Sequence, residues 1–589
     1  MTYPPAQHDV AGLQRATPHE ALPDTLTESL NRLLGPEAVR YRRLWAYYLN
    51  PMEPRALAAS AGNCERPYMQ AQEWGLPSRI TGYVGGEGIS DMLRVEQTAR
   101  KEVVVENDIG WRIDTMVDYA LGHAFTFSSL APEARGRHAV ERLMHAVFAN
   151  AGGHAFWQKL GLLAAVYGFV DVLVKLNEPA VHELTRRLEA AGDHNAAEGT
   201  ANTADVDDET VTMLAACIRL EVVEAPRALP VLSEDAERPT AYAQVWRLTP
   251  EPAGGERRDR SKPPTTPSAG WLRRWLPSRQ TAEGCGVASS SHQLGRTDAA
   301  VELLTAAAWY RYEYGRLVAR GTHVLGELPL VHMQNLAMPF SYAGASDVEP
   351  LIPLQDELNT RLSDRGYRIA MQSFKMFLGR GIENFGQLAI GPGQMWMTEN
   401  ESASIVEFGG DTASPGETQH IAEVREALDK ASGVNAVAAG AIKERVGNLT
   451  SAAALRVTML ALVIRTQRKR ASFEVGINQM SRLSLLWLER AGLLEAAGLA
   501  GLSHTPQLDV HWPGAIPASL SERLREAKDK LALGVPRDTV LKELGYEQPA
   551  GESNPQANPS VPTPIVNPPD TAKPAEAPAP AEAQVAPEA

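Results

Sequence analysis

Hydrophobic residues recur at helical spacing in two stretches of the chain, residues 346–374 and 415–432. The first stretch opens with an N-cap candidate, Ser346, and its leucines follow three or four residues apart: Leu351, Leu354, Leu358 and Leu362. The second opens with Ser414 and Pro415 and continues the same spacing: Ile421, Val424 and Leu428. Between them, glycines interrupt short apolar runs, a pattern typical of a small β unit. The order predicts a protrusion carried on two helices.

A longer helix is predicted further along, over residues 451–497. Its apolar positions share one face: Leu455, Met459, Leu462, Phe473, Ile477, Met480 and Trp487. Four basic residues interrupt that pattern: Arg465, Arg468, Lys469 and Arg470. We expect this basic cluster to face solvent or an interface.

The residues before the protrusion indicate a mixed α/β region, so the chain as a whole is expected to be α+β. Helices are predicted at residues 30–50 and 138–149, and Gly168 is expected to separate a helix from a strand. Further strands are predicted from Ile218, Ala241 and Ala306. In the last of these, alternation places the tyrosines on one buried face: Tyr310, Tyr312 and Tyr314.

Several segments lack the pattern of a packed core. Residues 1–31 are predicted to be mobile, and insertions at about 190–210 and 253–300 are predicted to be surface loops. The tail, residues 549–589, is rich in Pro, Ala and Glu and has no aromatic residue. It cannot bury enough apolar area to offset the entropy of ordering, so it is predicted to be disordered.

Composition narrows the class of protein. The 589 residues are 44% hydrophobic and carry a net charge of −14, which argues against a general nucleic-acid binder. The three cysteines form no CxxC pair, so neither a disulfide framework nor a zinc site is expected. We therefore expect a reducing compartment. The N-terminus lacks a signal-peptide pattern, and the longest apolar stretch, residues 160–176, is too short to span a bilayer.

Candidate chemistry is sparse. His138, Glu141 and His145 fall on one helical face and have the spacing of metal ligands or an acid–base pair, although exposed histidines explain the pattern more simply. The acidic run from Asp205 to Glu209 lacks calcium-loop spacing, and no phosphate-binding loop, GxSxG or HExxH motif is present. We therefore expect no enzyme activity, no metal and no cofactor.

The order of the elements resembles that of portal proteins of tailed bacteriophages. The resemblance is clearest where the ELPLVHMQN segment, residues 327–335, is followed by the 346–368 segment, which is similar to the start of a portal stem. Residues 66–80 and 106–122 resemble portal N-terminal segments. Residues 508–517 and 524–546 resemble the strand and helical hairpin that close such chains.

This resemblance implies a portal fold whose parts follow one another along the chain. They are a wing (32–340), a first stem helix (341–374), a clip (375–413), a second stem helix (414–432), a tunnel loop (433–450), a long helix (451–497), and a wing-return strand with crown-like helices (498–548).

The resemblance also implies a function in the virion. Portals form closed homo-oligomeric rings, dodecamers in virions, at one capsid vertex, through which double-stranded DNA passes without sequence recognition. The implied partners are the terminase large subunit and a head–tail adaptor at the clip, together with the major capsid and scaffold proteins. Assembly would take place in the host cytoplasm, with no membrane involved.

Three groups of residues carry these implied roles. The tunnel loop includes Asn435, Gly440, Lys443, Glu444, Arg445, Gly447 and Asn448. The channel-lining stem acids are Asp356, Glu357, Asp364, Glu423, Glu426 and Asp429, which in a ring would form a negative bore that repels phosphate. The clip aromatics are Phe377, Phe385, Trp396 and Phe408. If the chain forms no ring, the same acids are expected to be solvated carboxylates on an ordinary amphipathic helix pair.

Two other functions remain open from the sequence. One is a cytosolic metal-dependent enzyme that uses the face of His138, Glu141 and His145. The other is a helical scaffold that forms no ring, in which the long helix pairs as a coiled coil. The irregular apolar stripe and its basic interruption argue against the scaffold.

Overall fold

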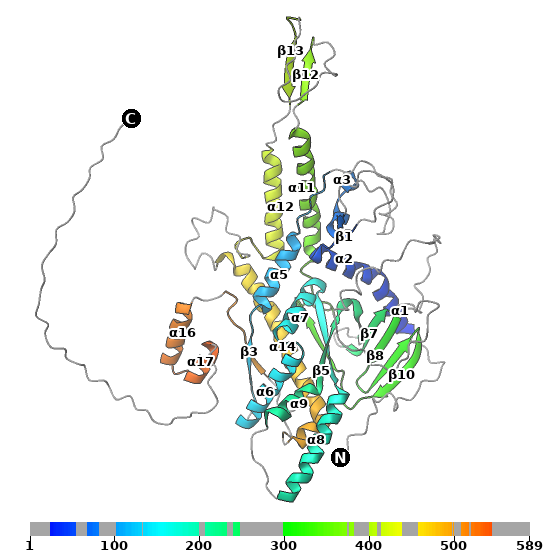
Figure 1. The fold of residues 1–589 in the computed structure, drawn as a ribbon, viewed down its shortest axis with the longest axis vertical. Coiled ribbons are helices and arrows are strands. Elements are labelled where there is room, and N and C mark those ends of the chain that lie inside the picture. The colour runs from blue at the N-terminus through cyan, green and yellow to red at the C-terminus, as the bar shows by residue number, and fades with distance from the viewer. Residues whose placement is uncertain are drawn as a thin grey trace, which may run out of the picture. The chain divides into compact units, whose positions relative to one another are not determined.

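The computed structural model of the chain describes residues 24–54, 68–81, 102–131, 133–198, 207–232, 239–247, 299–373, 376–381, 400–408, 414–438, 457–497, 499, 508–516 and 520–544. The chain divides into two compact units, Met1–Ile516 and Pro517–Ala589. Helices and antiparallel sheets both contribute, so the expected α+β class is confirmed (Figure 1). None of the described helices is long and apolar enough to cross a membrane.

The first unit contains most of the helices. They are α1 (Asp24–Arg32), η1 (Leu33–Glu37), α2 (Ala38–Leu49), η2 (Ala71–Gly75), α3 (Ser78–Thr81), α5 (Asp108–Leu121), α6 (Ala134–Asn150), α7 (His154–Tyr167), α8 (Glu178–Glu198), α9 (Asp208–Ala216), η3 (Ala225–Arg227), η4 (Glu349–Leu351), α11 (Ile352–Ser373), α12 (Pro415–Ser432), α14 (Leu460–Arg490) and α15 (Leu493–Ala496). The second unit holds α16 (Leu520–Ala532) and α17 (Arg537–Leu544).

All the described strands pair in antiparallel fashion. A five-stranded sheet has the order β10 (Arg316–Thr322), β9 (Ala308–Glu313), β8 (Ala299–Leu304), β7 (Pro239–Arg247), β6 (Ala228–Leu232). A three-stranded sheet has the order β11 (Leu330–Gln334), β4 (Phe169–Leu176), β5 (Ile218–Glu224). Three pairs complete the set: β1 (Met52–Pro54) with β2 (Tyr68–Gln70), β3 (Thr126–Ser129) with β14 (Leu508–His511), and β12 (Met376–Arg380) with β13 (Ser404–Phe408).

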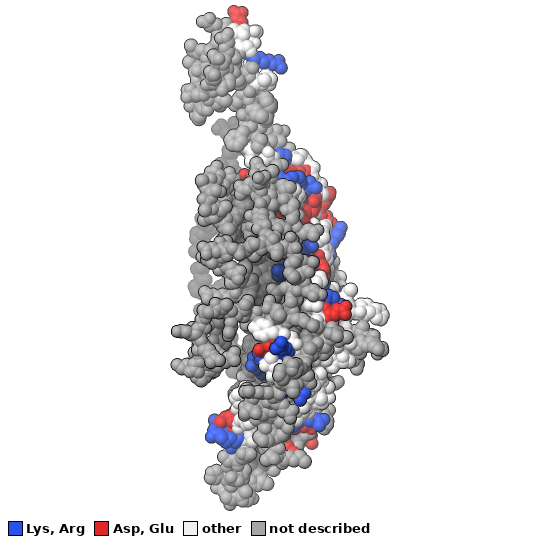
Figure 2. All heavy atoms as spheres, turned by 90° about the vertical axis from the view of Figure 1, so that its right-hand side faces the viewer, with Lys and Arg blue, Asp and Glu red and all other residues white. Residues whose placement is uncertain are grey.

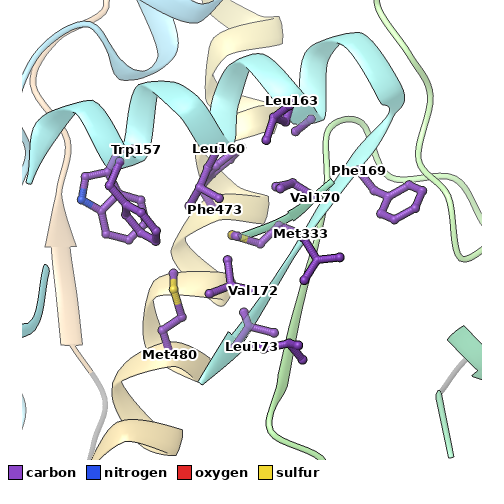
Figure 3. Packing of buried hydrophobic residues seen from close by; sticks show 14 of the residues in the cluster. Trp157, Leu160, Leu163, Phe169, Val170, Val172, Leu173, Met333, Phe473 and Met480 are labelled. Carbon is purple, nitrogen blue, oxygen red and sulfur yellow. The ribbon is translucent and has the colours of Figure 1, made fainter. Parts of the chain in front are cut away.

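The core of the first unit lies where α7, β4, β11 and α14 meet. Leu160 of α7, Val170 and Val172 of β4, Met333 of β11 and Phe473 of α14 are all buried, and Figure 3 shows these side chains directed toward one another. The first six residues of β4 are all buried, with no alternation of buried and exposed positions, because helices cover the sheet. This packing joins the long helix α14 to the sheet that precedes the stem.

The turn from α7 into β4 depends on one glycine. Gly168 caps α7 in the left-handed region at φ 96°, as the sequence predicted for the boundary between helix and strand. A Cβ at this position would overlap the carbonyl oxygen of Gly344, so the segment that leads into the stem packs directly on the turn.

The N-terminal region differs from expectation in two places. Residues 24–31, predicted to be mobile, belong to helix α1 and contribute Leu26 and Leu30 to the core. Residues 30–50 form not one helix but α1 and α2 joined by the π-helical η1. Pro36 within η1 removes a backbone donor, which accounts for the irregular turn.

The strand predicted from Ala306 is a hairpin. Its backbone turns at Tyr314, at φ 53°, and at Gly315, at φ 72°, so β9 and β10 pair with each other. Tyr312 is buried, but Tyr314 lies in the turn and is exposed, which corrects the prediction of three buried tyrosines.

Helical structure also extends into the first predicted insertion. The backbone of α8 continues to Glu198, and α9 begins at Asp208. Two predictions of loops, for residues 199–206 and 253–298, fall outside the described residues.

Candidate functional site

Two antiparallel helices, α11 and α12, flank the β12–β13 hairpin in the chain and form the candidate stem (Figure 1). The helix predicted from Ser346 begins with η4 at Glu349 and continues as α11 from Ile352. Ser346 does cap it, because its hydroxyl accepts the N–H of Val348 at 3.1 Å and of Glu349 at 3.3 Å. The predicted second helix coincides with α12.

Polar side-chain contacts join the two stem helices, and each helix also contributes a buried leucine. Arg368 of α11 pairs with Glu417 of α12, and His420 Nε2 of α12 lies 3.0 Å from Glu357 Oε1 of α11. Leu358 of α11 and Leu428 of α12 are fully buried. These contacts between the two helices therefore lie within one copy of the chain.

Three of the six predicted stem acids sit on α11 and contact groups of the same chain. Asp356 accepts the Tyr47 hydroxyl at 2.6 Å, and burial raises the pKa of this carboxyl. Asp364 accepts hydrogen bonds from both terminal nitrogens of Arg79, with Nη2 at 2.9 Å. The hydrogen bond from His420, with help from Arg361, lowers the pKa of Glu357.

The other three stem acids sit on α12. Asp429 lies 2.7 Å from Nη1 of Arg112, but burial outweighs that pairing and raises the pKa of the carboxyl. Glu423 is exposed and accepts the Gln419 amide at 3.0 Å, and Glu426 is exposed near Lys430 at 3.5 Å.

Asp364 and Asp429 thus pair with arginines of other elements, whereas Asp356 and Glu423 accept hydrogen bonds from neutral groups. On the face drawn in Figure 2, the basic and acidic side chains of the described residues lie next to one another, not in separate fields. The field of the stem is therefore weaker than its number of carboxylates suggests. Glu423 and Glu426 are the members of the set that face water most openly.

A buried charge cluster lies at the base of the stem and corrects one prediction. The basic residues of α14 were expected at a surface, but Lys469 is only 3% exposed and its ammonium contacts Asp347 Oδ2. Arg465 donates to Asp347 Oδ1 at 2.6 Å and 3.1 Å. Asn335 Nδ2 donates to Asp347 Oδ2 at 2.8 Å. Of the four basic residues, Arg468 alone is exposed as expected.

The charge states at this cluster follow from its contacts. Burial alone would raise the pKa of Asp347, but Lys469 and Arg465 outweigh burial and hold that pKa below its usual value. Burial lowers the pKa of the Lys469 ammonium, which Asp347 opposes. Three donors on one fully buried carboxylate satisfy the condition under which a buried ion pair is tolerated.

Arg470 is internal as well. Its guanidinium donates to the carbonyls of Tyr119 at 3.0 Å, Ala120 at 3.0 Å and Pro513 at 2.6 Å. It therefore ties α14 to the end of α5 and to the segment after β14. These carbonyl contacts replace the interface role that the sequence suggested for this residue.

The end of α12 is fixed by two arginines from distant parts of the chain. Arg465 Nη1 donates to the carbonyls of Ala431 at 3.2 Å and Ser432 at 2.9 Å. Arg112, itself buried, contacts the Ser432 hydroxyl at 3.2 Å and the Val434 carbonyl. Cations near a helix C-terminus stabilise the partial negative charge of its unpaired carbonyls, so these two arginines stabilise the end of α12.

Of the predicted tunnel-loop residues, the structure describes Asn435. Its side chain donates to the Thr458 carbonyl at 2.9 Å and accepts the Ala438 N–H at 2.9 Å, so the start of the loop is anchored near the start of α14. The remaining members lie outside the described residues: Gly440, Lys443, Glu444, Arg445, Gly447 and Asn448.

The predicted clip is described in part, as the hairpin of β12 and β13. Phe377 pairs in register with Glu407, and Phe408 with Met376. Phe385 and Trp396 lie outside the described residues. Leu378 and Val406 face each other across the pair and are each 45% exposed, so the hairpin presents an apolar surface.

The face proposed for a metal-dependent enzyme does not assemble a site. Glu141 accepts the backbone N–H of Ser129 at 2.8 Å, and His145 stacks on Phe127 with ring centres 4.2 Å apart. In the part of the chain that the structure describes, no group of three or more His, Cys, Asp or Glu side chains is placed to hold a metal ion. Asp207 instead caps α9, and Asp208 and Glu209 pair with arginines.

Sequence reasoning missed Asp347, Asn335 and Arg112. The available signal was local: Asp347 follows the helix cap directly, and Arg465 and Lys469 are four residues apart on one face of α14. Nothing in the sequence joins these two signals.

No family model matches the chain. The curated proteins give no match either.

Proposed function

We propose that this chain is a portal protein of a tailed bacteriophage, a ring-forming conduit for double-stranded DNA. The observation that carries the proposal is the order α11, β12, β13, α12 and α14, in which a helix pair bracketing a β hairpin is closed at its base against a long helix. A stem of this kind, repeated about one axis by heterologous contacts, closes into a ring.

Each part has a role in this proposal. The stem helices line the channel, with Glu423 and Glu426 as its most solvated acids. The hairpin docks the terminase large subunit during packaging and a head–tail adaptor afterwards, and its exposed Leu378 and Val406 suit such docking. The loop after Asn435 is the narrowest point of the channel.

The charge arrangement supports passage more than binding. An acidic chain with paired surface charges offers DNA few free cations, and duplex affinity comes mainly from Lys and Arg that neutralise phosphates. DNA would therefore slide with weak, non-specific contact. The packaging energy would come from a separate ATPase.

The test is negative-stain electron microscopy of the purified full chain, paired with a mass measurement at several salt concentrations. The proposal expects closed rings of roughly a dozen subunits with a central hole. Monomers or dimers under all conditions would overturn it. Elemental analysis of the same sample tests the enzyme alternative, which requires a bound metal.

A further inference from the structure

The segment between β11 and η4 presents an exposed aromatic side chain at residues 337–341, which we call the tip. Phe340 is 89% exposed, more than any other large apolar side chain that the structure describes, and Met338 is 48% exposed. Residues 333–346 include no Asp, Glu, Lys or Arg, so the tip meets solvent without a charge of its own. Aromatic residues without neighbouring charges are typical of the centre of a protein–protein interface.

The backbone holds Phe340 in a conformation that its side chain disfavours. Its φ is 59°, in the left-handed region, where bulky residues are rare. Such a conformation costs free energy and persists only where the surrounding structure holds it. Conformations of this kind cluster at functional sites. The exposure of Phe340 is therefore imposed by the fold.

One glutamine side chain joins the two ends of the tip. Gln334 Oε1 accepts the Met338 N–H at 3.2 Å, and Gln334 Nε2 donates to the Ser341 carbonyl at 2.8 Å. The base of the tip is fixed in turn, because the Ser472 hydroxyl of α14 donates to the Gln334 carbonyl at 2.6 Å. The tip is thus ordered before any partner binds, and less conformational entropy is lost on association.

A second uncharged surface lies at the start of α14. Val457, Leu460 and Ile464 follow one another three and four residues apart, so they share one side of the helix, and they are 72%, 52% and 48% exposed. We call this surface the α14 face. Residues 457–464 include no charged side chain, and Leu462 between them is buried in the core. The helix is therefore anchored on one side and open on the other.

The tip and the α14 face match each other in charge. On the side of the molecule drawn in Figure 2, acidic and basic side chains of the described residues lie next to one another, and an apolar tip that covered them would remove them from water at a cost. Two uncharged surfaces carry no such cost, and their association buries apolar area on both. A second copy of the chain supplies the required surface. The tip offers no cation to a phosphate, so DNA is not its partner.

We propose that the tip of one copy packs on the α14 face of the next copy, with Phe340 as the main anchor. The two surfaces differ, so the contact is heterologous, and its repetition about one axis closes a ring. The inference rests on the proposed function, because it names the contact between neighbouring subunits of that ring. Each copy then uses its tip on one side and its α14 face on the other.

The test is assembly of the full-length Phe340→Asn variant, measured by mass photometry over a dilution series. Asn removes the ring but is favoured at positive φ, so the variant should melt at the wild-type temperature or above it. We expect the concentration at which half of the chain is assembled to rise about thirtyfold or more, as for an interface anchor. Tyr314→Asn is the matched control, because Tyr314 is 51% exposed at φ 53° and lies outside the tip. The control should assemble as the wild type does.

A second variant, Ile464→Ala, tests the other side of the contact. Ala favours the helix, and we expect assembly to weaken about tenfold, whereas Val39→Ala, at a position 57% exposed on α2, should leave assembly unchanged. If the two surfaces meet, Phe340→Asn combined with Ile464→Ala weakens assembly by less than the product of the two single effects. Effects that multiply would overturn the pairing of tip and face. If Phe340→Asn does not fold, unchanged assembly of Ile464→Ala overturns the proposal.

The outcomes separate this inference from the proposed function. Rings that persist in Phe340→Asn at wild-type concentrations would overturn the inference and leave the portal proposal standing. Wild-type oligomers that never close into rings, but dissociate in Phe340→Asn, would overturn the portal proposal and support the contact. A wild-type chain that stays monomeric at every concentration would overturn both.

Discussion

Asp347 shows at the residue scale how one buried carboxylate can fix several elements. It lies before η4, yet Arg465 and Lys469 of α14 and Asn335 after β11 all donate to it. Removing its charge would leave an ammonium that is 3% exposed without an anion. The cost of an unpaired buried charge is much larger than the value of a surface pair.

We therefore predict that Asp347→Asn lowers the free energy of unfolding by about 3–5 kcal/mol. Asp364→Asn is the matched control: it breaks the more exposed pair with Arg79 and should cost no more than about 1 kcal/mol. Denaturant unfolding of both variants and the wild type measures the difference. Equal losses would show that Asp347 is not the dominant partner of Lys469.

The same residue predicts a pH dependence. The pKa of Asp347 is lower in the folded chain than in the unfolded one, so its stabilising contribution is present above the unfolded value of about 3.9 and lost as pH falls through the folded value. The stability gap between wild type and Asp347→Asn should narrow as the pH is lowered below about 4. Unfolding measured as a function of pH checks this, and a gap that widens in acid would be inconsistent with the sign.

At the scale of elements, the turn between α7 and β4 sets where the stem segment packs. Gly168→Ala would place a methyl group against the Gly344 carbonyl at φ 96°, so we predict a loss of about 2–4 kcal/mol. Gly416→Ala, in the first turn of α12, has nothing within 4 Å and should instead stabilise by about 0.4–1 kcal/mol. Thermal unfolding of the two variants should shift in opposite directions.

The sequence predicted elements better than it predicted contacts. Local signals sufficed for α12, where a proline at the start and Gly433 after the end bracket the apolar spacing. The alternation of side chains on the two faces of a strand continued through Tyr314, so the sequence predicted one strand where the structure has the β9–β10 hairpin. Gly315 was the one local sign of a turn in this stretch. Alternation alone cannot show where a strand reverses.

The candidate site was predictable where a property is local and not where it depends on distant residues. The acidic character of α11 and α12 is visible in the sequence, but the cations that pair with it, Arg79 and Arg112, come from more than 280 positions away. The burial of Lys469 depends likewise on Asp347, 122 positions earlier. Such pairings follow from the tertiary fold and leave no periodic trace.

At the scale of the whole molecule, the C-terminal residues 517–589 form a compact unit of their own. Ile516 ends the first compact unit, and α16 and α17 belong to the second, where Ala527 and Val540 are buried. We predict that a chain truncated after Tyr546 keeps both the melting temperature and the assembly state of the full chain. Light scattering after gel filtration measures the assembly, and loss of assembly would assign a structural role to the tail. Truncation after Ile516 removes the second unit as a comparison.

The ion pairs of Asp347 have one more consequence. Asp347 precedes the candidate stem and Arg465 and Lys469 follow it, so the two ends of the segment that carries the stem and its hairpin meet at one carboxylate. The entropy of closing a flexible loop grows only logarithmically with length, by about 0.6 kcal/mol for each doubling. Ends that are joined in this way let the hairpin be lengthened, shortened or exchanged while the rest of the first unit keeps its fold.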